Sequence, residues 1–260
     1  MKTEDLKTMA LHLHKLGLNI TNVDLKVNLE KWEEGKKLYK MPSNNRHQLK
    51  SNRQELCDVL NLDWSSSVGI GTVLGFNDLR ALDIDVIKSM KNYNIKPEAD
   101  KVLQLLTEIL RSLKLPNNYS WVTITPSGGM HIIFFSDEHD FKSQKTSAGN
   151  THQEKMTRGL IPNSKVKKLY PFLDNFELRW DYHLNLPPSI NEYGEQYKFA
   201  FARPMNTPRR VESQKLKKLF KAMCFEAATE NSPISGYNLS PSKYHAGHGH
   251  VDYTAIYRKH

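Results

Sequence analysis

The sequence predicts an α+β fold built on a mostly antiparallel sheet. The first indication is a strongly amphipathic segment, residues 96–116, in which apolar residues recur at helical spacing after Pro97. The second is a set of short β-rich runs that follow one another along the chain and are separated by turn residues. Runs joined by such short turns favour antiparallel pairing.

The N-terminal elements follow from the same patterns. An amphipathic helix is expected over residues 4–16 and a short strand over 17–23. A polar and basic arm follows over residues 30–55, and a short helix is expected over 52–60.

The remaining elements are mainly strands. Three pairs of β-rich runs are expected to form hairpins: 67–75 with 79–87, 120–126 with 130–135, and 175–180 with 183–190. A long polar loop is expected over residues 136–168, and a basic helix over 211–228.

Composition narrows the class of protein. Lys and Arg outnumber Asp and Glu by 37 to 28, and this surplus favours anionic partners, nucleic acid above all, although it also serves ordinary solubility. The two cysteines, Cys57 and Cys224, form no CxxC pair, which argues against a disulfide framework and favours a cytoplasmic location. No apolar run reaches the roughly 18 residues of a transmembrane helix, so no membrane partner is expected.

Asp83 and Asp85 stand one residue apart in the apolar run RALDIDVIK. Because side chains alternate along a strand, both carboxylates project from one face, roughly 6–7 Å apart. Two like charges at this separation are stabilised by a cation between them, and carboxylate oxygens suit Mg²⁺ or Mn²⁺. A strand with one solvated face explains the same pair, so this motif alone leaves both interpretations open.

A second motif, TPSGGMH, places Ser127, Gly128 and Gly129 between two strands and His131 at the start of the second. Glycines let backbone N–H groups approach a ligand closely, which favours anions, and His131 can donate to a phosphate. A tight hairpin turn beside a packed histidine is the alternative.

A third motif, ELR, places Glu177 and Arg179 on the same face of a strand. The guanidinium can bind phosphate oxygens in a bidentate manner. An ordinary ion pair between the two side chains is the alternative.

In this order the three motifs resemble the archaeo-eukaryotic primase superfamily, and more narrowly its bifunctional primase–polymerase (prim-pol) domains. The matching segments are LDID with Asp83 and Asp85, SGGMH from Ser127 to His131, and ELRWDYHLNLPPS from Glu177 to Ser189. GIGTVLG and Lys40-Met41-Pro42 also resemble the start of the family pattern, so the resemblance spans roughly residues 8–205.

The resemblance implies an N-terminal α/β subdomain packed on an RRM-like sheet, with the active-site cleft between them. It further implies that Asp83, Asp85 and Glu177 are catalytic and hold two divalent ions, Mg²⁺ or Mn²⁺. The nucleotide-binding residues that it implies are Ser127, Gly128, Gly129, His131, Arg179 and Lys40. The family often has aspartate where this chain has Glu177, whose longer side chain reaches further.

The implied function is a DNA-dependent primase/polymerase that makes or extends primers in the replication of a mobile element, phage or plasmid. Its partners would be single-stranded DNA template, primer strand and dNTP or NTP. The chain has no P-loop motif, so a helicase would act in trans or in a larger parent chain. Basic segments at residues 40–53, 165–168 and 209–221, the last with Phe220, are candidates for the template path.

Two alternatives stay open. One is a metal-dependent nuclease or Rep-like nickase, which uses the same acids or the tail residues His245, His248 and His250. The other is an inactive prim-pol fold that binds nucleic acid or docks a helicase. The expected domains are a prim-pol catalytic domain over residues 1–208, a basic helix within 209–228 and a flexible tail over 229–260.

Overall fold

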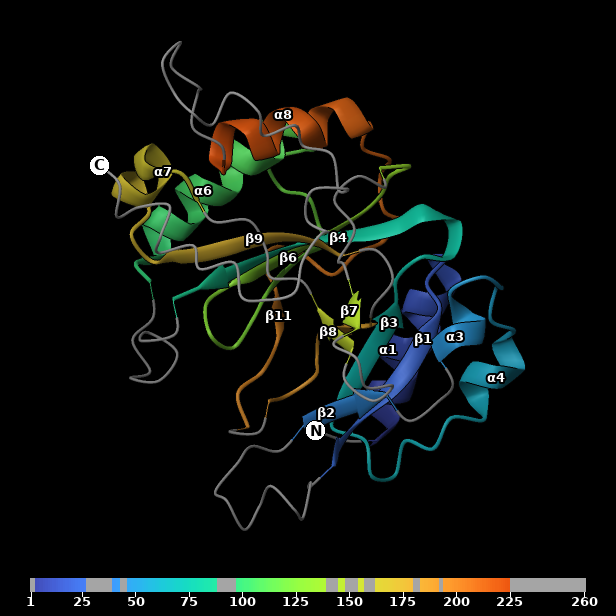
Figure 1. Ribbon diagram of the computed structural model, residues 1–260. Helices are drawn as coiled ribbons and strands as arrows, with labels where there is room; N and C mark the ends of the chain where they lie inside the picture. Colours follow the sequence, from blue (N-terminus) through green and yellow to red (C-terminus); the bar gives the residue numbers. More distant parts are fainter. Residues whose placement is uncertain are drawn as a thin grey trace. The chain divides into compact units, whose positions relative to one another are not determined.

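The structure is a computed structural model (Figure 1). It describes residues 3–26, 39–42, 46–87, 97–138, 145–147, 154–156, 162–179, 183–191 and 194–224. The helices are α1 (Thr3–Lys15), α3 (Arg46–Leu49), α4 (Leu56–Leu60), the 3₁₀ turn η1 (Phe76–Asp78), α6 (Ala99–Ser112), α7 (Ser164–Leu169) and α8 (Ser213–Met223). The strands are β1 (Ile20–Lys26), β2 (Tyr39–Pro42), β3 (Gly69–Val73), β4 (Leu79–Val86), β5 (Val122–Ile124), β6 (Met130–Phe135), β7 (Lys145–Ser147), β8 (Glu154–Met156), β9 (Leu173–Arg179), β10 (His183–Leu186) and β11 (Lys198–Phe199).

The chain separates into two compact units. The first comprises residues 1–143 and 158–226, and the second comprises 144–157 and 227–260. In the second unit the described residues form the antiparallel pair β7–β8, within the segment predicted to be a long loop. The tail histidines lie outside the described residues.

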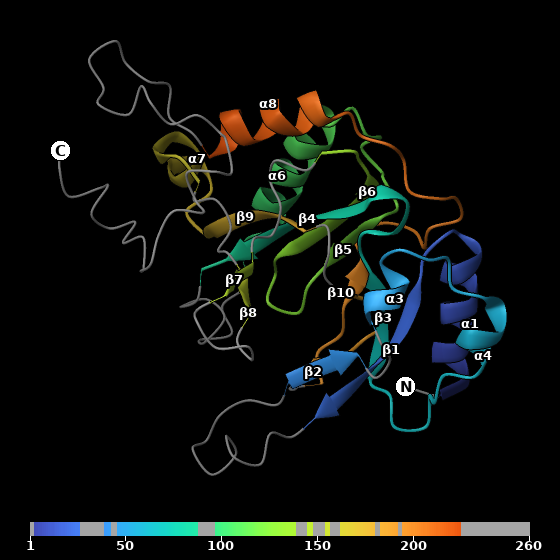
Figure 2. The same cartoon turned by 45° about the vertical axis from the view of Figure 1, so that its right-hand side comes forward.

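A four-stranded sheet in the first unit has the order β10-β3-β1-β2, and its strands pair antiparallel throughout. Helix α1 contacts β1 and β3, and Figure 2 shows α1 and α4 beside this sheet. The apolar residues of α1 that recur at helical spacing, Leu6, Ala10 and Leu13, are buried. The expected N-terminal helix and first strand are therefore present.

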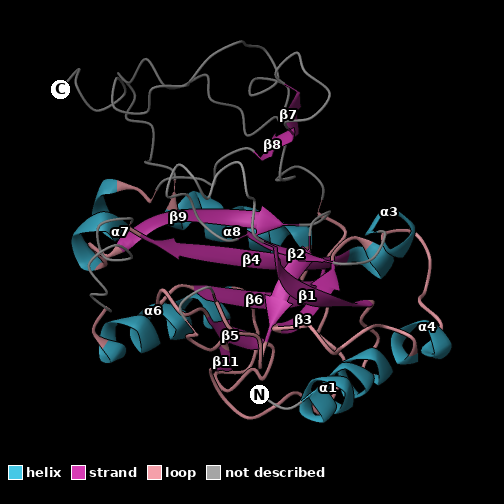
Figure 3. Ribbon diagram, turned by 90° about the horizontal axis from the view of Figure 1, so that it is seen from below, coloured by secondary structure: helices cyan, strands magenta, loops and turns pink. Residues whose placement is uncertain are grey.

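A five-stranded antiparallel sheet has the order β11-β5-β6-β4-β9, which Figure 3 shows from below. Along the chain, β4 is followed by α6, β5, β6, α7 and β9. This βαββαβ order with β4 between β6 and β9 is the arrangement of the ferredoxin-like and RRM-like folds. The predicted α+β class with an RRM-like, mostly antiparallel sheet is confirmed.

Helices α6 and α8 cover one face of the five-stranded sheet (Figure 1). They contact each other and bury Leu105, Leu106, Ile109, Leu110, Leu216, Leu219, Phe220 and Met223. Each such side chain stabilises the fold by about 1.5–3 kcal/mol on burial. Burial of Phe220, 1% exposed, shows that the prediction of a DNA-stacking role for this residue is wrong.

Two of the three predicted hairpins are wrong. Strands β3 and β4 lie in different sheets, as do β9 and β10, so neither pair is hydrogen-bonded as a hairpin. Between β3 and β4 the backbone changes direction at Gly75, whose φ is 112°, and at the η1 turn. The hairpin of β5 and β6 is as predicted, with Thr123 opposite His131.

Helix α8 forms within the predicted basic segment 211–228. Among the described residues, the structure has no helix with the length and apolar character needed to cross a bilayer.

Candidate active site

A row of polar side chains crosses the five-stranded sheet on the face opposite α6 and α8. Asp83 on the inner strand β4 lies directly opposite His131 on β6 and Glu177 on β9. Directly opposed residues of antiparallel strands place their side chains on the same face. Asp85 shares that face two residues along β4 and lies opposite Asn175. Register therefore brings together the acids and the histidine that the three motifs singled out.

Arg179 contacts the carboxylates of both Asp83 and Glu177 in this row. Its Nη2 lies 2.7 Å from Asp83 Oδ2 and 3.2 Å from Glu177 Oε2. On the other side, His131 Nε2 lies 3.4 Å from Asp83 Oδ1. The predicted alternative of a same-face ion pair between Glu177 and Arg179 is thus present, and Asp83 joins it.

The site is withdrawn from water, which changes the acidity of Glu177. The side chain of Glu177 is 11% exposed and that of Asp83 is 7% exposed. Burial raises the pKa of the Glu177 carboxyl from 4.5 to about 7, with a further rise from the nearby charges of Asp83 and Asp85. Arg179 acts in the opposite direction and lowers this pKa. A carboxyl group whose pKa lies near neutral pH is suited to release its proton and bind a metal cation in its place.

Several buried polar atoms on this face have no hydrogen-bond partner among the described residues. They are Thr123 Oγ1, His131 Nδ1, Asn175 Oδ1 and Glu177 Oε1. Leaving such a group unsatisfied costs about 1–3 kcal/mol, so native structures rarely keep several together without a ligand or water. These atoms therefore offer hydrogen-bonding capacity to a ligand or to water.

The glycines of the SGGMH motif build the turn between β5 and β6. Gly128 has φ +88° and donates its N–H to the carbonyl oxygen of Thr125 at 2.9 Å, so this amide serves the turn. A Cβ on Gly129 would lie 2.5 Å from the carbonyl oxygen of Ile84, so only glycine fits beside β4. Ser127 Oγ lies 3.0 Å from Thr125 Oγ1 within the same turn. These glycines therefore form the tight turn that was one of the two interpretations of the motif. An additional role in binding anions stays a prediction.

Lys40 lies on β2, at the edge of the four-stranded sheet, where it pairs with Leu25. Its side chain lies outside what the structure describes, so its nucleotide-binding role stays a prediction. Exposed lysines of the predicted template path occur on α7 and α8, among them Lys165, Lys168, Lys218 and Lys221. Because α8 covers the face of the sheet opposite the acids, a strand bound along it would not pass over the carboxylates.

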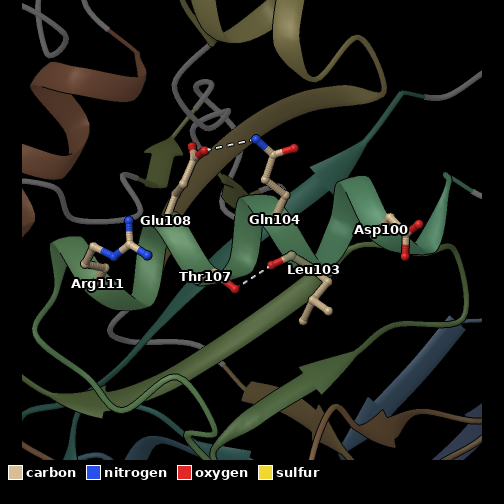
Figure 4. A pocket seen from close by; sticks show the side chains of 6 residues that line it. All are labelled: Asp100, Leu103, Gln104, Thr107, Glu108 and Arg111. Atoms are coloured by element: carbon tan, nitrogen blue, oxygen red, sulfur yellow. Dashed lines mark hydrogen bonds between the residues drawn. The ribbon is translucent and has the colours of Figure 1, made fainter.

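A concave patch on the outer side of α6 has a different character (Figure 4). Its hydrogen bonds run along the helix, from Gln104 Nε2 to Glu108 Oε1 at 3.4 Å and from Thr107 Oγ1 to the carbonyl oxygen of Leu103 at 2.8 Å. These are ordinary contacts between residues four apart on a helix. The patch brings together no catalytic groups, and it lies away from the acid row.

Sequence reasoning missed two further residues near the row. Tyr197 has its ring centroid 6.1 Å from that of His131, and its hydroxyl lies 3.5 Å from Asn185 Nδ2. Alternation in HLNL could have placed Asn185 on one face of β10 together with His183. No sequence pattern links Tyr197 to His131.

The carboxylates suit a hard divalent cation by their chemistry. Asp83, Asp85 and Glu177 supply oxygen donors, and Glu177 Oε1 is buried without a hydrogen-bond partner among the described residues. Within the part of the chain that the structure describes, no three His, Cys, Asp or Glu side chains stand ready to hold a metal ion. In this structure the Arg179 guanidinium contacts both Asp83 and Glu177. The residues fit a cation if the guanidinium moves aside.

A sequence model described as bifunctional DNA primase/polymerase, N-terminal, matches residues 17–210, a range that includes the strands of both sheets. The chain belongs to this family, and thus to the primase/polymerase-type nucleotidyltransferases. No curated protein matches the sequence.

Proposed function

We propose that this protein is a DNA-dependent primase/polymerase that joins nucleotides on a single-stranded template during replication of a mobile element, phage or plasmid. The observation that supports this most is the register of three strands, which aligns His131, Asp83 and Glu177 across the sheet. Asp85 adds a further carboxylate on the same face of β4. Three acids beside a histidine and an arginine suit a reaction in which a triphosphate is bound and cleaved.

Asp83, Asp85 and Glu177 would hold two divalent ions, Mg²⁺ or Mn²⁺. When bound, such ions activate the attacking 3′-hydroxyl and stabilise the pyrophosphate leaving group. The pairing of β4 with β9 positions the carboxylates that would hold the ions, because it fixes Asp83 opposite Glu177. Burial of both carboxylates strengthens their electrostatic interaction with a cation, because the local dielectric constant is low.

Arg179 and His131 would bind the triphosphate. In the protein alone, the guanidinium of Arg179 contacts the carboxylates of Asp83 and Glu177. In the nucleotide-bound site its guanidinium would contact phosphate oxygens, which it matches in geometry and charge. His131 lies on the opposite side of Asp83, so the two donors would contact the phosphates from both sides of β4.

The template and primer strand would approach from the acid-bearing face of the sheet. Any helicase would act in trans or belong to a larger parent chain. Starting a new strand is primase activity, and extending an existing strand is polymerase activity. The strand-synthesis assay described below measures both.

The experiment is strand synthesis on single-stranded DNA with labelled dNTPs or NTPs, with and without a primer, in Mg²⁺ or Mn²⁺. The variant Asp83→Ala/Asp85→Ala is expected to lose about a thousandfold or more in rate, because several kcal/mol of transition-state stabilisation disappear. The matched control is Asp100→Ala, which removes a carboxylate from the outer face of α6 and should leave the rate unchanged.

The products separate the competing functions. Metal-dependent extension that the double variant lacks supports the proposal. Template cleavage without new strands would identify a nuclease or nickase instead. DNA binding with neither reaction would leave a nucleic-acid-binding or helicase-docking module.

A further inference from the structure

The four-stranded sheet contributes a second wall to the acid-bearing face. Asn185 on β10 and Tyr197 before β11 lie on the side of His131 that looks away from α6 and α8. Asn185 Nδ2 lies 3.5 Å from the Tyr197 hydroxyl, and the Tyr197 and His131 rings are tilted by 31° with centroids 6.1 Å apart. Tyr197 therefore links Asn185 of the four-stranded sheet to His131 of the five-stranded sheet.

A hydrogen-bonded turn fixes the position of Tyr197. The chain reverses between Ile190 and Gln196, which form a β-bridge, and the Tyr197 N–H donates to the carbonyl oxygen of Ser189 at 2.8 Å. Ser189 is itself fully buried, and its hydroxyl bonds both the N–H and the carbonyl oxygen of Ile70 on β3. The Tyr197 backbone is thus anchored to the core of the four-stranded sheet, which helps to preorganise its side chain for contact with a ligand.

The polar atoms along this wall indicate what a ligand must offer. Asn185 Oδ1 is buried and has no hydrogen-bond partner among the described residues, and the same holds for Thr123 Oγ1 and His131 Nδ1. An amide oxygen in that condition accepts a hydrogen bond from a ligand donor or from water. Beside it, an aromatic ring offers an apolar face. The combination suits a group that carries both a hydroxyl and a C–H face.

A nucleotide sugar is such a group. The distance between His131 and Tyr197 is consistent with a sugar beside Tyr197 when the triphosphate contacts His131. If His131 and Arg179 contact the triphosphate, as the proposed function requires, the sugar follows the α-phosphate by a few bonds. The 6.1 Å between the rings of His131 and Tyr197 is a separation of that size. The opposite side of His131 is already taken by Asp83, at 3.4 Å.

We propose that Asn185 and Tyr197 form the sugar-binding wall of the nucleotide site, a role that rests on the proposed function. The Asn185 amide bonds a sugar hydroxyl, and the Tyr197 ring packs against the sugar. These residues therefore distinguish a nucleoside triphosphate from an inorganic triphosphate. They also distinguish nucleotides by their sugar.

Calorimetric titration of the full chain in Mg²⁺ tests this with dNTP, dideoxy-NTP, NTP and inorganic tripolyphosphate. Asn185→Ala is expected to weaken binding of the hydroxyl-bearing nucleotide about tenfold, the effect of one lost hydrogen bond. Tyr197→Ala is expected to weaken all three nucleotides, and Tyr197→Phe to weaken them less. Tripolyphosphate should bind every one of these variants as it binds the unmodified chain, which also shows that they are folded.

Two comparisons complete the design. His131→Ala should weaken nucleotides and tripolyphosphate alike, because it removes a phosphate contact. Gln196→Ala, an exposed neighbour of Tyr197 whose amide bonds the carbonyl oxygen of Pro188, should change neither. A dNTP advantage over dideoxy-NTP that disappears in Asn185→Ala identifies the 3′-hydroxyl, and an NTP advantage that disappears identifies the 2′-hydroxyl.

The inference is overturned if the Asn185 and Tyr197 variants bind nucleotides as tightly as the unmodified chain does. Equal loss of tripolyphosphate, or an unmodified chain that binds nucleotides no better than tripolyphosphate, overturns it as well. Failure of the proposed function looks different. A chain that binds nucleotides through this wall but synthesises no strand would retain the sugar site and contradict the polymerase proposal.

Discussion

Arg179 and Asp83 form a close charge contact in the acid row, with Nη2 and Oδ2 2.7 Å apart. The same nitrogen also contacts Glu177, so one guanidinium balances two opposed carboxylates. This side chain therefore stabilises the negative charge of both Asp83 and Glu177.

The variant Arg179→Gln should therefore destabilise the metal-free protein by about 3 kcal/mol, because removing one partner leaves buried charge uncompensated. Mg²⁺ or Mn²⁺ should then raise the melting temperature of the variant more than that of the unmodified chain. Thermal denaturation with and without the ions measures both effects. The control is Arg203→Gln at an exposed position. Equal ion-induced shifts in Arg179→Gln and the unmodified chain would contradict the prediction.

The acidity of Glu177 predicts how stability and metal binding vary with pH. A carboxyl whose pKa is raised on folding binds more protons in the folded chain, so the free energy of unfolding falls as pH rises from 4.5 through about 7. In Glu177→Gln this decline should be absent, while it is present in the metal-free unmodified chain.

Metal ions compete with the same proton. Mg²⁺ should raise the melting temperature of the unmodified chain more above pH 7 than below it, because binding requires the carboxylate form. Scans at about pH 6 and about pH 8, with and without Mg²⁺, measure the difference. An Mg²⁺ shift of the same size at both pH values would show that Glu177 is not a ligand.

Gly129 should tolerate no side chain. In Gly129→Ala the new Cβ would lie 2.5 Å from the carbonyl oxygen of Ile84, next to Asp85. Overpacking of this kind costs about 1–3 kcal/mol, and the shift of β4 should also lower activity. Gly194→Ala is the comparison: its φ of +78° strains any side chain, but a Cβ there meets nothing within 4 Å, so this variant should leave activity unchanged. Chemical denaturation and strand synthesis test the pair, and equal effects of the two variants on activity would contradict the prediction.

The hydroxyl of Ser189 should be required to attach the turn after β10 to strand β3 by hydrogen bonds. In Ser189→Ala the backbone N–H and carbonyl oxygen of Ile70 lose a hydrogen-bond partner 2.8 and 2.9 Å away. The expected loss of stability is about 2 kcal/mol, because buried groups are left unsatisfied. Ser112→Ala, which removes a hydroxyl from the exposed side of α6, should change stability by less than about 0.5 kcal/mol. Denaturant titration compares them, and similar losses would refute the anchoring role.

The composition of the acid row could be predicted from the sequence because it depends on alternation. Asp83 and Asp85 had to share a face once their segment formed a strand, and the same holds for Glu177 and Arg179. Local patterns also predicted the helix at 96–116, which forms as α6 over Ala99–Ser112. These features are decided within one element.

Pairing between distant strands could not be predicted in this way. Short turns made β3 with β4, and β9 with β10, look like hairpins, but alternation does not specify which strand is the partner. Tyr197 was missed for the same reason. It meets His131 only because the turn after β10 is bonded to β3, a contact between residues 119 positions apart in the case of Ser189 and Ile70.

The place of β10 in the four-stranded sheet affects how the chain can fold during synthesis. Residues 183–186 complete that sheet beside β3, yet they are made after β4, β6 and β9 of the other sheet. A nascent or truncated chain that ends before residue 183 would leave one edge of β3 unpaired, and open edges promote aggregation. The four-stranded sheet is therefore completed only after the chain has passed through β9 of the other sheet, and a shortened version of the protein should retain the chain through β10.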